Sequence, residues 1–191
     1  MDIGWYEGDR WYHDLVAGVR DGRPREAEEP AEVGVDTALS IISLANRGGH
    51  PVTVRVPATM VVSAAMLHAH GLADGDTTWC AGDLSWLGAQ VHGIYGPLAC
   101  GATTVMYEGT LDIPTHRRAW EVLERHAVST ILTTPSVLRT MWAWSGSLDC
   151  LPGLDALRRV VVFGESAEPE LRDWAAAHLS PGQQLSVADG W

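Results

Sequence analysis

The sequence predicts an α/β fold, with a mostly parallel sheet covered by helices on both faces. From Asp36 onward, short runs of β-branched or apolar residues alternate with longer segments of helical pattern, which is the order typical of such a sheet. Pro135 and Pro169 each begin one of the helical segments, at a position where the first turn tolerates proline. No internal repeat or low-complexity stretch points to another architecture.

The elements follow one another in chain order. The strand-like runs are residues 38–44, 52–56, 77–81, 102–107, 130–133 and 160–163. The helical segments are residues 58–70, 87–99, 113–126, 135–144 and 169–179. Before them, a short aromatic patch leads into a polar, proline-punctuated and acidic linker. We therefore predict an N-terminal arm over 1–35 and one α/β domain over 36–191.

Composition argues against several classes of function. The net charge of -11 disfavours a nucleic-acid surface, since phosphate backbones require a basic stripe. All 13 basic residues are arginine, so no lysine can orient a carboxylate, hold a phosphate or form a Schiff base. No apolar run approaches the ~20 residues of a membrane helix, and the first residues lack the basic start of a secretory signal. Cys80, Cys100 and Cys150 are odd in number and far apart, which indicates reduced thiols in the cytoplasm rather than a disulfide or metal framework.

Several ordered segments carry a resemblance to one family. Residues 79–109 read WCAGDLSWLGAQVHGIYGPLACGATTVMYEG, which resembles the acetyl-CoA synthetase stretch WCTADVGW followed by YGPLxxGATTxMxEG. WYHDLV at 11–16, TTPSVLRTM at 133–141, FGES at 163–166 and VADGW at 187–191 resemble further family motifs in the same order. The chain is thus identified as a degenerate, truncated relative of the AMP-forming acetyl-CoA synthetases. It matches the central part of the large N-terminal domain of these adenylate-forming enzymes.

The family's phosphate loop corresponds to Arg47, Gly48, Gly49, His50 and Pro51. In the family, hydroxylated residues, glycines and a lysine surround the β and γ phosphates of ATP. Here the hydroxyls are gone and a valine, Val52, occupies the lysine position. Arg47 and His50 would supply some positive charge, but we expect a turn that joins the strands on either side.

The family's acyl pocket corresponds to Trp86, Leu87, Gly88, Phe163 and Trp191. The resemblance implies that Trp191 forms the wall that restricts the pocket to short acyl groups. Phe163 replaces a family valine and would narrow the pocket further, while Gly88 replaces a threonine and removes its hydroxyl. The alternative is that these residues only form apolar core.

Residual nucleotide binding is assigned by the resemblance to Gly164, Glu165, Ser166, Asp189 and Trp191. Gly164 and Glu165 match a family motif at a strand end, where a parallel sheet usually binds its ligand. Ser166 replaces a proline, and Asp189 falls one position past the family's aspartate. The family's magnesium-binding glutamate, ribose-binding aspartate and C-terminal lysine would lie beyond Trp191. We therefore expect no catalytic residue, no metal site and no adenylation by this chain alone.

ATP, AMP and CoA are the ligands that the resemblance implies, whereas magnesium is not expected. Asp112 matches a family asparagine that contacts CoA, and a carboxylate there repels a polyanionic ligand. Three functions stay open: a ligase completed by another polypeptide, a non-catalytic scaffold or assembly partner that keeps the fold, and a decaying fragment. The scaffold would contact another chain or a second copy of itself, and neither nucleic acid nor membrane is an expected partner.

Overall fold

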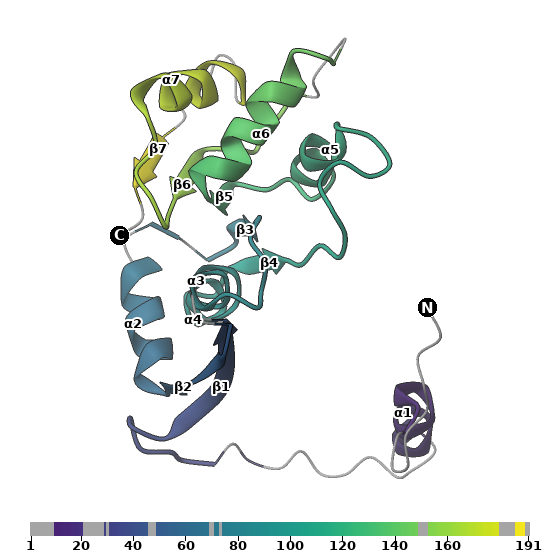
Figure 1. The fold of residues 1–191 in the computed structure, drawn as a ribbon, viewed down its shortest axis with the longest axis vertical. Helices are drawn as coiled ribbons and strands as arrows, with labels where there is room; N and C mark the ends of the chain where they lie inside the picture. Colours follow the sequence, from purple (N-terminus) through teal and green to yellow (C-terminus); the bar gives the residue numbers. More distant parts are fainter. Residues whose placement is uncertain are drawn as a thin grey trace. The chain divides into compact units, whose positions relative to one another are not determined.

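The computed structural model describes residues 10–20, 29, 31–45, 49–68, 71–72, 74–148, 153–179 and 186–189 of the 191-residue chain (Figure 1). The chain forms two compact units, Met1–Val33 and Gly34–Trp191. The smaller unit contains helix α1, Tyr12–Arg20, which the sequence analysis missed because it treated the segment as an arm. Asp14 lies in the first turn, where the helix dipole favours a carboxylate.

The larger unit begins with a two-stranded antiparallel hairpin. Strand β1, Ala38–Ala45, pairs with β2, Pro51–Pro57, and Ile42 lies opposite Val54. Ile42 and Val56 are the buried residues of this hairpin among those described. The two strands that the sequence predicts on either side of this loop are present, and they pair with each other directly.

A five-stranded parallel sheet forms the centre of this unit. Its order is β4-β3-β5-β6-β7. The strands are β3 (Thr77–Cys80), β4 (Thr103–Val105), β5 (Thr130–Thr133), β6 (Arg159–Val162) and β7 (Ser186–Asp189). Every pairing in it is parallel, so the predicted sheet type is confirmed. Strand β7 was not predicted, because its four residues, SVAD, lack a run of β-branched side chains.

The helices follow the predicted segments with shifted ends. They are α2 (Thr59–His68), α3 (Leu87–Gln90), η1 (Val91–Tyr95), α4 (Gly96–Ala99), α5 (Arg118–Arg125), α6 (Pro135–Ser145) and α7 (Pro169–His178). The helix predicted over 87–99 contains a π-helical turn, η1. The helix predicted from residue 113 begins only at Arg118, whose N–H closes a turn onto the carbonyl of Thr115. No described helix has the length and apolarity needed to cross a membrane.

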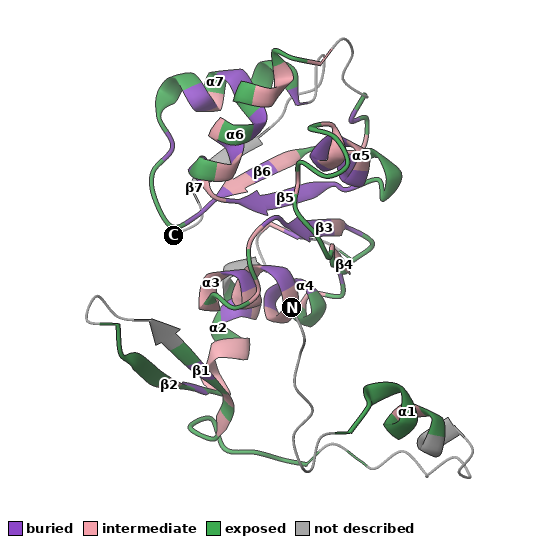
Figure 2. Cartoon of the chain, turned by 45° about the vertical axis from the view of Figure 1, so that its right-hand side comes forward, coloured by how far each residue is buried: buried purple, intermediate pink, exposed green. Residues whose placement is uncertain are grey.

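Helices pack on both faces of the sheet. Successive side chains of a strand point to opposite faces, so both faces of the sheet offer apolar surface to the helices. Trp79 and Ile131 point into the larger core, together with buried residues of α5, α6 and α7. Cys80 and Leu132 point the other way, into a smaller core with Ala89 of α3. Figure 2 shows the buried residues concentrated on the central strands and on the helix faces against them. The predicted arrangement of helices on both faces is confirmed.

A polar clamp connects the amino ends of three adjacent strands. Asp76 precedes β3, Ser129 precedes β5 and Arg158 precedes β6. The Ser129 hydroxyl donates to Asp76 Oδ1 at 3.0 Å, and the Arg158 guanidinium donates to the same oxygen. Asp76 is only 8% exposed, so these partners compensate its removal from water.

Helix α5 ends in a Schellman cap. The Val128 N–H donates to the carbonyl of Leu123, and the Ala127 N–H donates to that of Glu124, each at 3.0 Å. Ala127 has a φ of 46°, in the left-handed region that this cap usually reserves for glycine.

Candidate functional site

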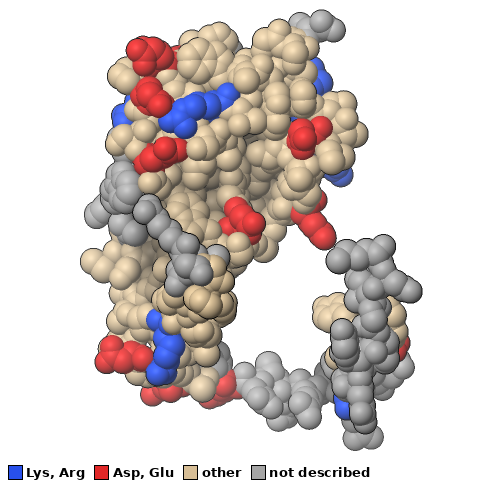
Figure 3. All heavy atoms as spheres, viewed as in Figure 1, with Lys and Arg blue, Asp and Glu red and all other residues tan. Residues whose placement is uncertain are grey.

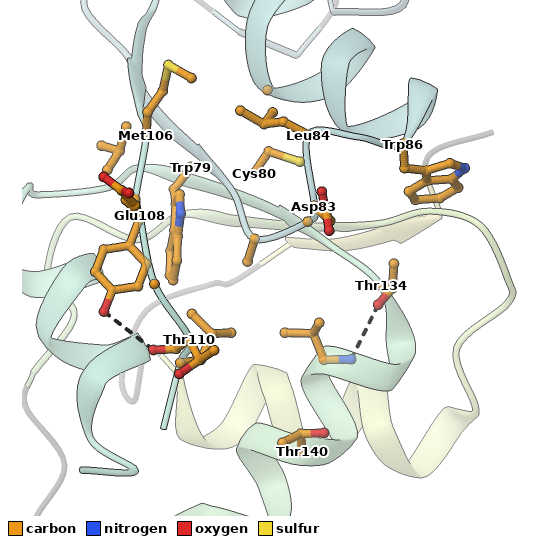
Figure 4. A pocket seen from close by; sticks show the side chains of 18 of the residues that line it. Trp79, Cys80, Asp83, Leu84, Trp86, Met106, Glu108, Thr110, Thr134 and Thr140 are labelled. Carbon is orange, nitrogen blue, oxygen red and sulfur yellow. Dashed lines mark hydrogen bonds between the residues drawn. The ribbon is translucent and has the colours of Figure 1, made fainter. Parts of the chain in front are cut away.

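A cavity of about 1030 Å³ lies at the carboxyl ends of β3, β4 and β5 (Figure 4). Its walls come from residues 79–84 at the end of β3, residues 105–111 at the end of β4, and the first three turns of α6 with its capping residue. The carboxyl edge of a parallel sheet is the usual place for a ligand because the loops there are free to vary. The cavity is therefore the leading candidate for a binding site.

The cavity wall is mostly apolar. Trp79 meets Tyr107 edge-on, with ring centroids 6.4 Å apart and an interplanar angle of 84°. At the α6 side, Trp144 stacks on His116, with centroids 4.8 Å apart. The Tyr107 hydroxyl donates to the carbonyl of Thr110 at 3.4 Å, which is a long hydrogen bond that holds the ring against this loop.

A short turn fixes one carboxylate at the cavity. The Ser85 N–H donates to Asp83 Oδ1 at 2.8 Å, and the Trp86 N–H donates to the Asp83 carbonyl. The backbone hydrogen bond from Ser85 lowers the pKa of Asp83, and the Ser85 side chain adds to the effect. Asp83 is therefore ionised at neutral pH. Gln90 of α3 donates to the carbonyl of Leu84 at 2.9 Å and secures the same turn.

Three of the predicted acyl-pocket residues come together beside this cavity. The ring of Trp86 stacks on Phe163 with centroids 5.2 Å apart and an interplanar angle of 17°. A Cβ atom at Gly88 would lie 3.2 Å from Trp86 Cη2, so the indole covers this glycine closely. His92 also contacts Phe163, at a centroid distance of 4.6 Å. Phe163 is only 2% exposed, so aromatic rings fill the space around these residues.

The remaining acyl-pocket residues contribute less to this cluster. Leu87 is half-buried at the first position of α3. Trp191 lies outside the residues that the structure describes.

The predicted nucleotide residues follow β6. Gly164, Glu165 and Ser166 are exposed, and Gly164 has a φ of 90°. Glu165 Oε1 accepts a hydrogen bond from the Ser136 hydroxyl at 2.9 Å and lies 3.5 Å from Arg139. Asp189 ends β7, where its backbone is in register with Val162 of β6, so the Asp189 backbone lies near the strand end that precedes Gly164.

Arg139 links two acidic residues at this edge. It lies 2.6 Å from Glu168 Oε1 and forms the longer contact with Glu165. The hydrogen bond from Arg139 lowers the pKa of Glu168, and the bond to Glu168 raises the pKa of Arg139. The arginine is thus held between carboxylates. Figure 3 shows basic and acidic side chains interspersed over this face of the molecule.

The described part of the predicted phosphate loop, Gly49, His50 and Pro51, lies at the start of β2. Arg47 and Gly48 fall outside the described residues. Gly49 has a φ of 75°, and His50 is exposed. Pro51 starts β2 opposite Ala45, and Gly49 and His50 directly precede this strand.

Cys80 is the buried thiol of the cavity wall. Burial raises its pKa to about 12, so the group stays protonated at neutral pH and is a poor nucleophile. Cys100 is half-buried, and its thiol donates to the carbonyl of Ala65. Cys150 lies outside the described residues. Within the described ranges, no group of three or more metal-binding side chains is assembled.

The family model described as AMP-binding enzyme matches residues 49–191. The chain belongs to the AMP-binding enzyme family. The acetyl-coenzyme A synthetase of Alkalilimnicola ehrlichii is 32% identical over 194 residues, covering 100% of this chain and 29% of that protein. The corresponding protein of Mesorhizobium japonicum is 33% identical, covering 99% of this chain and 29% of its own length. The chain thus spans less than a third of the relatives that it matches.

Two solved structures have the same fold as this chain. An acyl-CoA synthetase from Brucella canis superposes with a TM-score of 0.72 at 24% identity, covering 95% of this chain and 33% of that one. Acetoacetyl-CoA synthetase from Streptomyces lividans gives a TM-score of 0.71 at 22% identity, covering 87% of this chain and 26% of that one. The predicted resemblance to acetyl-CoA synthetases is therefore confirmed.

Much of the cavity wall was not predicted from the sequence. Knowing the family does not by itself identify the residues of this wall. Residues 105–111 and the α6 positions Thr134, Val137, Thr140 and Trp144 were not singled out as site residues. A signal existed, because polar residues such as Glu108 and Thr110 directly follow β4 at the carboxyl edge of the sheet. Nothing in the local pattern, however, predicts that α6 closes the opposite wall.

Proposed function

We propose that this chain is a ligand-binding domain of the acetyl-CoA synthetase type that does not adenylate acetate by itself. The observation that carries the proposal is the stack of Trp86 on Phe163 at the acyl-pocket positions. Rings in van der Waals contact leave no space between them for an acyl group. Phe163 is also buried against His92, so it has little freedom to move aside.

The composition of the loop that corresponds to the family's phosphate loop supports the same proposal. The loop at Gly49, His50 and Pro51 carries neither hydroxylated side chains nor a lysine, and the whole chain contains no lysine. Removing one group that stabilises developing charge typically costs about 10²–10³ in kcat. The loss of several such groups reduces adenylation by this chain to background.

A weak nucleotide site remains part of the proposal. Glu165 is held by Ser136 and Arg139 at the carboxyl end of β6, beside the backbone of Asp189. Exposed Gly164 and Ser166 leave room for a base to approach this strand end. We place AMP here rather than ATP, because AMP does not require the phosphate loop.

Acetate-dependent ATP–pyrophosphate exchange tests the proposal. We expect background exchange for the chain and for Phe163→Val, which opens the stack while the phosphate loop stays unchanged. A full-length acetyl-CoA synthetase in the same assay is the positive control. Exchange by the chain that disappears in Glu165→Ala would refute the proposal. AMP binding is measured separately, by the thermal shift of the chain and its loss in Glu165→Ala.

A second candidate function, assembly with another polypeptide, is favoured by exposed apolar side chains. Ile41 on β1 and Met66 on α2 are 67% and 69% exposed, and Val62 of α2 is exposed as well. Val62 and Met66 lie one turn apart on α2, and large exposed apolar groups on neighbouring positions are typical of interfaces. We propose that this surface contacts another chain or a second copy. Analytical ultracentrifugation of the chain and of Ile41→Ser/Met66→Ser tests this, and a wild type that stays monomeric with no co-purifying chain argues against it.

We further propose a cytoplasmic location. Cys80 and Cys100 are both free thiols, which persist in a reducing compartment. Cell fractionation of the tagged protein tests this placement.

A further inference from the structure

Glu165, at the proposed nucleotide site, has a long side chain on the loop that follows β6. This side chain is 48% exposed, so little packing restricts its rotamers. Fixing such a side chain in one orientation lowers its conformational entropy and opposes ligand binding. A ligand that uses this carboxylate therefore binds more tightly if contacts within the protein hold the side chain in place beforehand.

A hydrogen bond from α6 restricts the Glu165 carboxylate. The Ser136 hydroxyl donates to Glu165 Oε1 at 2.9 Å, although 29 residues separate the two in the sequence. Ser136 lies in the first turn of α6, one residue after Pro135, and Thr134 caps this turn. These local features fix the start of the helix, so the hydroxyl comes from a regular element and reaches a carboxylate on a loop.

Arg139 also approaches Glu165, but it is shared with a second carboxylate. Its guanidinium lies 3.5 Å from Glu165 Oε1 and 2.6 Å from Glu168 Oε1. The shorter contact with Glu168 leaves the contact with Glu165 long, and exposed ion pairs of this kind contribute little to stability. Ser136 is therefore the group that best determines where the Glu165 carboxylate lies.

The two contacts leave one oxygen of Glu165 available. Ser136 and Arg139 both reach Oε1, and no hydrogen bond among the described residues reaches Oε2. An ionised carboxylate oxygen accepts hydrogen bonds and donates none. The matching donors in AMP are the uncharged groups of its nucleoside part, since a carboxylate repels the phosphate.

We propose that Ser136 is a positioning residue of the nucleotide site. Its hydroxyl holds Glu165 Oε1, so that Oε2 accepts a hydrogen bond from the nucleoside part of AMP. Ser136 acts through Glu165 and donates nothing to the ligand. The inference rests on the proposed AMP site at Gly164 and Glu165, and it adds to that site a residue from another element, α6.

Titration of AMP into the full chain and its variants, followed by calorimetry, measures the effect. Immobilising one rotamer-rich side chain on binding corresponds to about twofold to tenfold in affinity. We expect Ser136→Ala to weaken AMP binding by about this factor. Ser136→Thr restores a hydroxyl at the same position and should bind AMP as the wild type does. The control, Ser147→Ala, removes an exposed hydroxyl just past the end of α6 and should leave the affinity unchanged.

Two further readouts separate positioning from general stabilisation. Ser136 is exposed, so the Tm of ligand-free Ser136→Ala should change no more than that of the Ser147→Ala control. The Ser136 hydroxyl is uncharged, so the factor lost in Ser136→Ala should be the same at low and high salt. Arg139→Gln should cause a smaller loss, and that loss should shrink as salt is added, because an exposed ion pair is screened.

The possible failures of the inference and of the AMP site are distinguishable. Equal AMP affinity of the wild type and Ser136→Ala, together with lost binding in Glu165→Ala, would overturn the inference and leave the AMP site standing. No AMP binding by the wild type would overturn the site itself, and the role of Ser136 with it. A Ser136→Thr variant as weak as Ser136→Ala would show that the hydroxyl is not the group that matters. If Ser136→Ala fails to fold, Ser136→Cys decides, because its thiol is a weak donor of similar size and should cause the same loss.

Discussion

Ala127 has a left-handed backbone conformation. This conformation is unfavourable for alanine and nearly free of cost for glycine. Its φ of 46° is left-handed, and a side chain with a Cβ loses about 1–2 kcal/mol in that region. Glycine carries an entropic penalty of about 0.5–1 kcal/mol on folding, which offsets part of this gain. Ala127 is exposed, so removing its Cβ leaves no buried cavity. We expect Ala127→Gly to raise the free energy of unfolding by about 0.5–1 kcal/mol.

Urea denaturation followed by tryptophan fluorescence measures this change. For a chain of this size, about 1 kcal/mol corresponds to roughly 2–4 °C in Tm, so a thermal melt gives an independent reading. The matched control is Ala143→Gly, at an exposed position within α6, which should lower the free energy of unfolding by about 0.5–1 kcal/mol. If both variants are destabilised to the same extent, the strain at Ala127 does not exist and the reasoning fails.

Three further predictions concern the site. Cys80, with its pKa near 12, should resist iodoacetamide at pH 8 in the folded chain and react once urea unfolds it, as read by mass spectrometry. Gly164→Ala should destabilise the fold by about 1–2 kcal/mol, because φ is 90° and the new Cβ would lie 3.1 Å from Trp86 Cη2, as read by urea denaturation. Glu168→Gln should lower stability at neutral pH through the lost pairing with Arg139. Since the pKa of Glu168 is lowered from 4.5 in the folded state, this contribution is present above pH 4.5 and disappears as pH falls through the folded-state value.

Each of these has a contrary result. Rapid alkylation of Cys80 at the rate of an unfolded thiol would contradict its burial. A Gly164→Ala variant as stable as the wild type would mean that the Trp86 ring moves aside without cost. A difference between wild type and Glu168→Gln that does not shrink as Glu168 is protonated at low pH would show that the effect is not electrostatic.

The helix starting at Pro135 shows what local sequence predicts well. Thr134 caps it, with its Oγ1 accepting the Val137 N–H at 3.3 Å, and proline occupies the first turn. Both signals are local, so the start of α6 was predicted to the residue. The same holds for β5, whose bounds match the predicted run of residues 130–133.

The π-helical turn η1 shows what local sequence does not predict. Residues 87–99 were predicted as one helix, yet Val91–Tyr95 adopt the wider hydrogen-bonding ring of a π-helix. Gly93 in this turn packs closely against the sheet, because a Cβ there would lie 2.9 Å from Cys80 Cβ on β3. The contact joins a helix to a strand earlier in the chain, so its influence is invisible in either segment alone. The cavity wall was missed for the same reason, because it depends on three strand ends meeting.

The clamp at Asp76 has a consequence for how the protein is made. Asp76 is separated by 53 residues from Ser129 and by 82 residues from Arg158. At about 5–20 residues per second, a ribosome needs roughly 4–16 s after Asp76 to synthesise Arg158. For the first 53 residues of that time neither clamp partner of Asp76 has been made, and Arg158 completes the clamp last. At this stage of synthesis β3, the first strand of the five-stranded sheet in chain order, has no β5 to pair with. A chaperone would find an unpaired strand edge to bind at this stage.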